Sequence, residues 1–177
     1  MNKFLWLVLF PFSAGAASPV LPPCNVERTA QIYFSSTSTT DALRVSVKGA
    51  PCWEGMASIS ITNKKGEIIY RRDQRFKSLN AVQWDDPIQP DLAKKFVNHT
   101  IEKGMVGDSS QLPPWEGKGD DFYEKNSTSP TIDTARYEAL RKMKLPVFYH
   151  QTHYEGGRHL VYDPKQKAAV IILEGGL

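Results

Sequence analysis

Alternating apolar and polar residues predict several half-buried strands in the N-terminal half of the chain. Residues 43–47 alternate between apolar and polar side chains, and residues 57–61 repeat this period of two. Such alternation is typical of strands with one face in the core and the other in water. Residues 67–76 return as a partner strand after a glycine-containing turn at residues 63–66, and residues 29–35 are rich in β-forming side chains. These segments predict an N-terminal antiparallel meander.

Three further strand-like runs occupy the C-terminal end of the chain. Residues 147–154 and 159–163 flank a segment that contains Gly156-Gly157, whereas residues 168–173 are apolar throughout. Glycine adopts the positive φ of a two-residue hairpin turn without a Cβ clash, so the glycine pair predicts such a turn. A continuous apolar run is typical of a strand that is covered on both faces. The C-terminal part is therefore predicted to form hairpins that end in a buried strand.

Two helices are predicted between these groups of strands. In residues 90–103 the apolar side chains recur at helical spacing on one face, and Gly104 follows, as glycine often does just past a helix end. A second helix is predicted at residues 132–143, where Asp133 near the start favours the helix dipole. Residues 105–130 have no such period and are rich in glycine and proline, which predicts a long loop.

The order of these elements predicts an α+β fold. We expect a single domain with an antiparallel sheet, formed by the N-terminal meander plus C-terminal hairpins, with two helices between. The domain is expected to span residues 18–177, which is 160 of the 177 residues and enough to bury a core. It would include the long loop at about residues 105–130.

Residues 1–17 have the features of a cleaved signal peptide. Lys3 precedes an apolar run at residues 4–12, and residues 14–16 supply the small side chains that a cleavage site needs. The apolar run is shorter than the about 20 residues that span a bilayer. A buried N-terminal helix is the alternative interpretation. The leader predicts an exported protein, periplasmic or secreted, with no transmembrane segment after cleavage.

The charge balance of the chain is close to neutral. It has 22 Lys and Arg residues against 19 Asp and Glu residues, a formal net charge of +3 at pH 7 that becomes +2 once Lys3 is removed. Because the basic residues are also spread along the chain, no nucleic-acid partner is predicted. Arg71, Arg72 and Arg75 form the densest basic group. A solvated strand edge explains this group, and a site for a polyanion is the alternative.

Cys24 and Cys52 are the two cysteines of the chain. In an oxidising compartment, two cysteines pair most simply as one disulfide. Prolines precede both cysteines and are typical of stiff loop ends. A reactive free thiol is the alternative. The sequence predicts a Cys24–Cys52 disulfide that ties the start of the domain to the first turn of the meander.

Three of the four histidines lie close together near the C-terminus, which raises the question of a metal site. His150 and His153 would point to opposite faces of a regular strand, because side chains alternate along it. A site that also included His159 would therefore need a bulge. The chain has no paired-cysteine zinc signature and no His-Glu-x-x-His helix. No metal and no cofactor is predicted.

A two-residue glycine turn would fix the register of the first C-terminal hairpin. Tyr154 would then lie opposite His159 and His150 opposite Asp163, so that these four side chains share one face of the sheet. A carboxylate opposite a histidine can fix its tautomer and prepare it as a base or a ligand. A solvated polar face, a binding site and a catalytic site all stay open as interpretations. A register shift of one residue would separate the four side chains.

The tryptophans give a second indication of a binding surface. Trp53, Trp84 and Trp115 all lie in or near predicted turns, beside proline or acidic residues. Tryptophan is enriched where protein partners bind, and Trp115 in the long loop is the best candidate for such a contact. The alternative is that these rings fold back and cap the core.

The leading functional hypothesis is a small exported binding protein that acts by protein recognition. The chain has no Gly-x-Ser-x-Gly elbow, no phosphate-binding glycine loop and no Ser-x-x-Lys motif. A partner in the cell envelope is expected, as for an inhibitor of an envelope hydrolase or an immunity protein. The candidate binding residues are Trp115, Trp53, His150, Tyr154, His159 and Asp163. The alternatives are an envelope enzyme or metal-binding protein that uses the face with His150, His159 and Asp163, and a structural envelope component.

Overall fold

The computed structural model describes residues 22–79, 90–116, 119–153 and 155–175. The predicted leader at residues 1–17 lies outside these ranges, as do Trp84 and the predicted site residue Tyr154.

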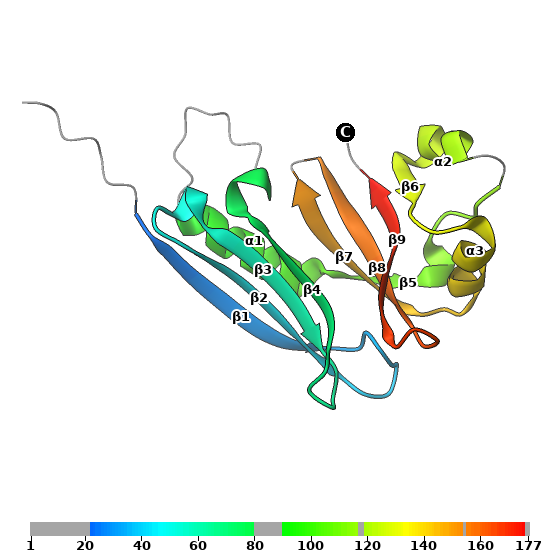
Figure 1. The fold of residues 1–177 in the computed structure, drawn as a ribbon, viewed down its shortest axis with the longest axis horizontal. Coiled ribbons are helices and arrows are strands. Elements are labelled where there is room, and N and C mark those ends of the chain that lie inside the picture. Colours follow the sequence, from blue (N-terminus) through cyan, green and yellow to red (C-terminus); the bar gives the residue numbers. More distant parts are fainter. Residues whose placement is uncertain (1–21, 80–89, 117–118, 154, 176–177) are drawn as a thin grey trace, which may run out of the picture.

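Two antiparallel sheets and three α-helices make up the described part of the chain, which confirms the α+β fold (Figure 1). The first sheet has the order β1 (Cys24–Ile32), β2 (Asp41–Gly49), β3 (Met56–Thr62) and β4 (Ile68–Arg75). The second sheet has the order β5 (Met105–Asp108), β7 (Pro146–His153), β8 (Gly156–Asp163), β9 (Ala168–Gly175) and β6 (Thr128–Pro130). The helices are α1 (Pro90–Lys103), α2 (Gly119–Asn126) and α3 (Thr134–Lys142). Within the described ranges, every helix falls short of the length and apolarity that a membrane span requires.

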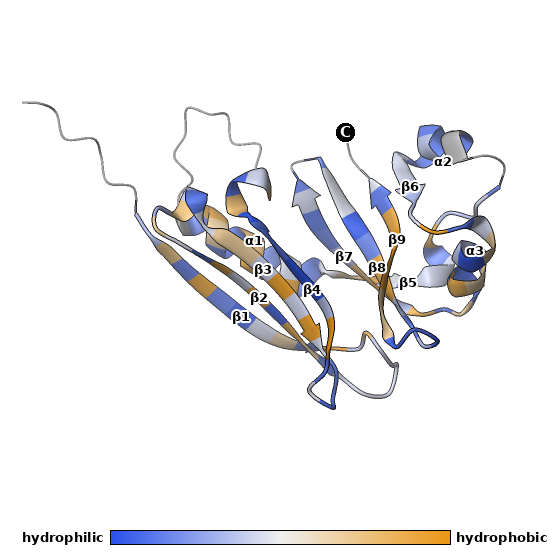
Figure 2. Cartoon of the chain, in the orientation of Figure 1, coloured by the Kyte–Doolittle hydropathy of each residue, from blue (hydrophilic) through white to orange (hydrophobic). Residues whose placement is uncertain are grey.

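The first sheet is the predicted meander, and its strands alternate between core-facing and outward side chains. Figure 2 shows this alternation as stripes along β1, β2 and β3. Val45 on β2 lies opposite Ile59 on β3, and both side chains are buried. In the pairing of β3 with β4, Arg72 lies opposite Ile59, so this arginine also belongs to the inner face. The inner face of β4 is therefore polar where its neighbours are apolar.

Two hydrophobic cores lie on the two sides of the second sheet. The first core joins the inner face of the first sheet to α1 and to one face of the second sheet, where Phe148 and Leu160 contribute. The second core lies on the opposite face, where Val161 packs with Tyr137 of α3 and with Phe122 of α2. Figure 1 shows the resulting order, from the first sheet through the second sheet to α2 and α3.

The predicted disulfide is present between Cys24 and Cys52. Both cysteines are buried, at 5% and 1% exposure, and they belong to the first core. The bond links the first residue of β1 to the short 3-10 helix η1 (Cys52–Glu54), which lies between β2 and β3. A disulfide of this kind is compatible with an exported protein.

The segment at residues 105–130, predicted as a long loop, contains regular structure instead. It forms β5, the 3-10 helix η3 (Ser109–Gln111), α2 and β6. The strands have only four and three residues, and each pairs with a strand that lies far along the sequence. Periodicity cannot reveal strands this short, because they contain too few residues to show an alternation.

The predicted register of the hairpin between β7 and β8 is wrong. His150 lies opposite Arg158, and Tyr149 lies opposite His159. Gly157 belongs to β8 and not to a turn, and positive φ occurs at Gly66 and Gly107 but not at Gly157. A Cβ on Gly157 would lie 2.5 Å from the His150 carbonyl oxygen and from the Tyr149 ring. Glycine is therefore needed at this position for a close approach of strands and not for a turn.

Candidate functional site

The structure separates His150 from His159 and Asp163, which were predicted to share one face of the hairpin. His150 points toward the first sheet, where it contacts Tyr70, and it also contacts Phe148 of its own strand. His159 and Asp163 lie at alternate positions of β8, and their register with Val161 places them on the opposite face. His150 therefore does not lie opposite Asp163, and the predicted cluster is not formed. Among the described residues, no three His, Cys, Asp or Glu side chains form a group that could hold a metal ion.

His150 is instead the buried half of a hydrogen-bonded pair between the two sheets. It is 1% exposed, and its Nε2 lies 2.5 Å from the Tyr70 hydroxyl. Its Nδ1 lies 3.0 Å from the backbone carbonyl of Gln151. Because a carbonyl can only accept, Nδ1 carries the proton, and Nε2 of the neutral ring accepts from the Tyr70 hydroxyl. The pair links β4 of the first sheet to β7 of the second.

Burial is the main reason that both members of this pair are neutral. Burial lowers the pKa of His150 from its usual 6.5 to about 4, and the positive charges of Arg158 and Arg72 act in the same direction. Burial also raises the pKa of Tyr70 to about 12. Arg158 forms an ion pair with Glu174, with 2.8 Å between Nε and Oε1. The pair is thus a neutral link at neutral pH.

Asp163 links the second sheet to α3 through an ion pair. Its Oδ2 lies 2.8 Å from an Arg136 guanidinium nitrogen, and its Oδ1 accepts from the backbone N–H of Lys165 at 2.8 Å. Burial acts to raise the pKa of Asp163, but these hydrogen bonds outweigh it and hold the pKa below its usual 3.8. These contacts explain the burial of Asp163 without a ligand.

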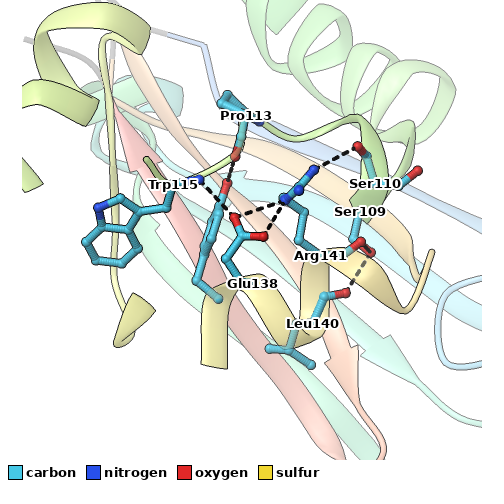
Figure 3. A network of polar contacts seen from close by, with 8 residues as sticks. Ser109, Ser110, Pro113, Trp115, Glu138, Leu140 and Arg141 are labelled. Carbon is cyan, nitrogen blue, oxygen red and sulfur yellow. Dashed lines mark hydrogen bonds and ion pairs between the residues drawn. The ribbon is translucent and has the colours of Figure 1, made fainter. Parts of the chain in front are cut away.

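Trp115 is half-buried and packs into the second core. Its ring centroid lies 6.0 Å from that of Phe122 and 5.8 Å from that of Tyr137, both in edge contact. Figure 3 shows the polar network on its backbone side, where the Trp115 N–H donates to Glu138 Oε1 at 2.8 Å. Arg141 donates to the same carboxylate at 3.1 Å. The packing favours the interpretation in which the ring caps the core.

Trp53 is also half-buried, and it packs against the first core. The Nζ atom of Lys77 lies 5.3 Å from the centroid of its ring, which is within the range of a cation–π contact. Both Trp53 and Trp115 therefore have structural contacts that account for their positions. Their predicted role in binding stays a prediction.

A groove between α1 and β7 is a site that the hydrophobic pattern did not reveal. It has a volume of about 470 Å³, in the usual range for ligand sites. Leu92 and Phe96 of α1 contribute apolar surface to it, and the backbone segment around His150 forms the opposite wall. Lys95, His99 and Lys103 line its α1 side and are exposed.

The positions of these three side chains follow from the geometry of α1. Residues spaced by four lie on the same side of a helix, so Lys95, His99 and Lys103 form one row beside the buried row that includes Phe96 and Thr100. None of the three forms an ion pair with any other described residue. The row can be found in the sequence, because its three residues recur at helical spacing in the predicted helix. The packing of β7 beside this row cannot be found in the same way, because the two segments lie far apart in the sequence.

Comparison with protein-family models, with curated proteins and with solved structures finds no match to this chain.

Proposed function

We propose that the protein is an exported binding protein that recognises an acidic, extended segment of a partner protein in the groove between α1 and β7. The observation that carries this proposal is the row of Lys95, His99 and Lys103 beside the apolar surface of Leu92 and Phe96. The cationic side chains of Lys95 and Lys103, which have no ion-pair partner among the described residues, favour an anionic ligand, and apolar surface beside them adds contact area.

The spacing of the row supports an extended peptide as the ligand. Side chains four residues apart in an α-helix are separated by about 6 Å along the axis. Alternate side chains of an extended peptide, which point to the same side, are separated by about 6.7 Å. A segment with acidic residues at every second position would therefore match Lys95, His99 and Lys103 in turn.

A fluorescence titration with two labelled peptides tests this proposal. One peptide repeats Glu-Thr and the other repeats Gln-Thr, so they differ in charge and not in length. We expect the mature protein to bind the Glu-Thr peptide, more weakly as salt is added because the contacts are exposed. Reversal of two charges in the double variant Lys95→Glu/Lys103→Glu should weaken binding by about tenfold or more.

Lys94→Glu is the matched control. Lys94 is exposed on α1 beside Lys95 but does not line the groove. This variant changes the net charge by the same amount per substitution, so it should leave binding within about twofold of the wild type. Equal binding of the Gln-Thr peptide, or equal losses in Lys94→Glu and Lys95→Glu, would contradict the proposal.

A further inference from the structure

A second hollow lies between α2, β6 and the hairpin of β7 and β8. It has a volume of about 630 Å³. It is lined by Tyr123 of α2, by His159 of β8 and by Tyr149 of β7. The contacts and charges of its lining differ from those of the groove on α1, so it requires a different ligand.

Aromatic rings form one wall of this hollow. The ring centroids of Tyr149 and His159 lie 4.9 Å apart, on opposite positions of β7 and β8. Tyr123 is 37% exposed, so its ring can meet a ligand from the α2 side. The faces of tyrosine rings carry partial negative charge and attract cations that lose part of their water.

Glycine backbone forms the wall beside these rings. A Cβ on Gly157 would lie 2.5 Å from the Tyr149 hydroxyl, and a Cβ on Gly175 would lie 2.6 Å from the Ser127 carbonyl oxygen. Both positions are therefore restricted to glycine while the neighbouring groups stay in place. Gly157 and Gly175 lie opposite each other on β8 and β9, and both line the hollow.

The charged side chains that line the hollow are carboxylates. Glu124 and Glu155 are both exposed at this hollow, and no lysine or arginine is among the described residues that line it. Neither carboxylate forms an ion pair with a described residue. His159 does not supply a compensating charge, because burial lowers its pKa and the ring is neutral at pH 7.

We propose that this hollow binds an organic cation, either an alkylammonium or a guanidinium group. The rings of Tyr123 and Tyr149 would contact the apolar carbons and the charge of the cation, while Glu124 and Glu155 balance the charge. This site shares Tyr149 with the groove on α1, but it selects the opposite charge.

Calorimetric titration of the mature protein with two cations tests the proposal. The probes are tetramethylammonium and arginine amide, and their neutral counterparts are tert-butanol and citrulline amide. We expect saturable binding of at least one cation below about 10 mM and none of its neutral counterpart. Tighter binding of tetramethylammonium would indicate a free ammonium compound, and tighter binding of arginine amide would indicate an arginine side chain of a partner.

Conservative variants distinguish the hollow from general surface charge. Glu124→Gln and Glu155→Gln keep the shape of each side chain and should each weaken binding by roughly fivefold. Glu116→Gln is the control, because Glu116 is exposed but does not line the hollow. The proposal is overturned if neither cation binds, if the neutral compounds bind equally well, or if the three variants lose the same affinity. Circular dichroism of each variant shows that the fold is intact.

Discussion

His150 shows how the position of one residue in a strand determines its chemistry. The same imidazole, placed on the other face of β7, would have lain near His159 and the acidic hollow. On the inner face it instead meets the Tyr70 hydroxyl, two arginines and the Gln151 carbonyl, and it is held neutral. A neutral, fully hydrogen-bonded histidine stabilises the fold only while it stays unprotonated.

We therefore predict that the free energy of unfolding decreases as the pH falls from about 6.5 to about 4. The pKa of His150 is about 4 in the folded state and near its usual 6.5 in the unfolded state. Between these values the unfolded state binds more protons, so acid favours unfolding, by roughly 3 kcal/mol over the whole window. Burial lowers the pKa of His159 as well, which adds to the effect in the same direction.

Urea unfolding of the wild type and of His150→Gln, measured between pH 7 and pH 4.5, checks this prediction. The variant should be less stable at pH 7 but should have a shallower dependence on pH. Asp163, whose pKa is lowered from its usual 3.8, loses its contribution only below about pH 4 and stays outside this window. Equal slopes in both proteins would show that His150 is not the group that titrates.

At the scale of elements, local patterns predicted most of the secondary structure. Alternation predicted β2 and β3, and helical spacing with a terminal glycine predicted α1, which spans Pro90–Lys103 as expected. The register of β7 against β8 was predicted wrongly, because two glycines favour a turn as well as a close approach of strands. The inward placement of Tyr70 could not be predicted, since it depends on how the two sheets pack.

The start of α3 allows a test of a predicted helix signal. Asp133 is the N-cap of this helix, and its Oδ1 accepts from the Arg136 N–H at 2.9 Å. Asp133→Ala removes this acceptor and should lower the free energy of unfolding by about 1 kcal/mol. Asp133→Asn keeps an acceptor at the same place and should cost clearly less. Urea unfolding at pH 7 measures both, and equal losses would argue against the capping contact.

At the scale of the whole molecule, the disulfide constrains a large share of the first sheet. Cys24 and Cys52 are separated by 28 positions, and the closed loop contains β1 and β2. Closing a loop of this length in the unfolded chain contributes on the order of 3–4 kcal/mol to stability. The predicted leader and this bond together favour an oxidising compartment.

Reduction should therefore destabilise the protein strongly. We expect urea unfolding in the presence of a reductant to show a loss of roughly 3–4 kcal/mol relative to the oxidised protein. The double variant Cys24→Ser/Cys52→Ser should have the stability of the reduced protein and should not respond to reductant. A wild type that keeps its stability after complete reduction, confirmed by thiol titration, would contradict this account.

Strand β8 gives the molecule one further property. Leu160 and Val161 are neighbours in the chain, yet Leu160 belongs to the first core and Val161 to the second. One strand of eight residues is thus shared by both cores. Loosening of either core removes a wall of the other, so the two cores are expected to melt together as a single cooperative unit. The two cores are therefore distinct in the structure but are expected to unfold in one transition.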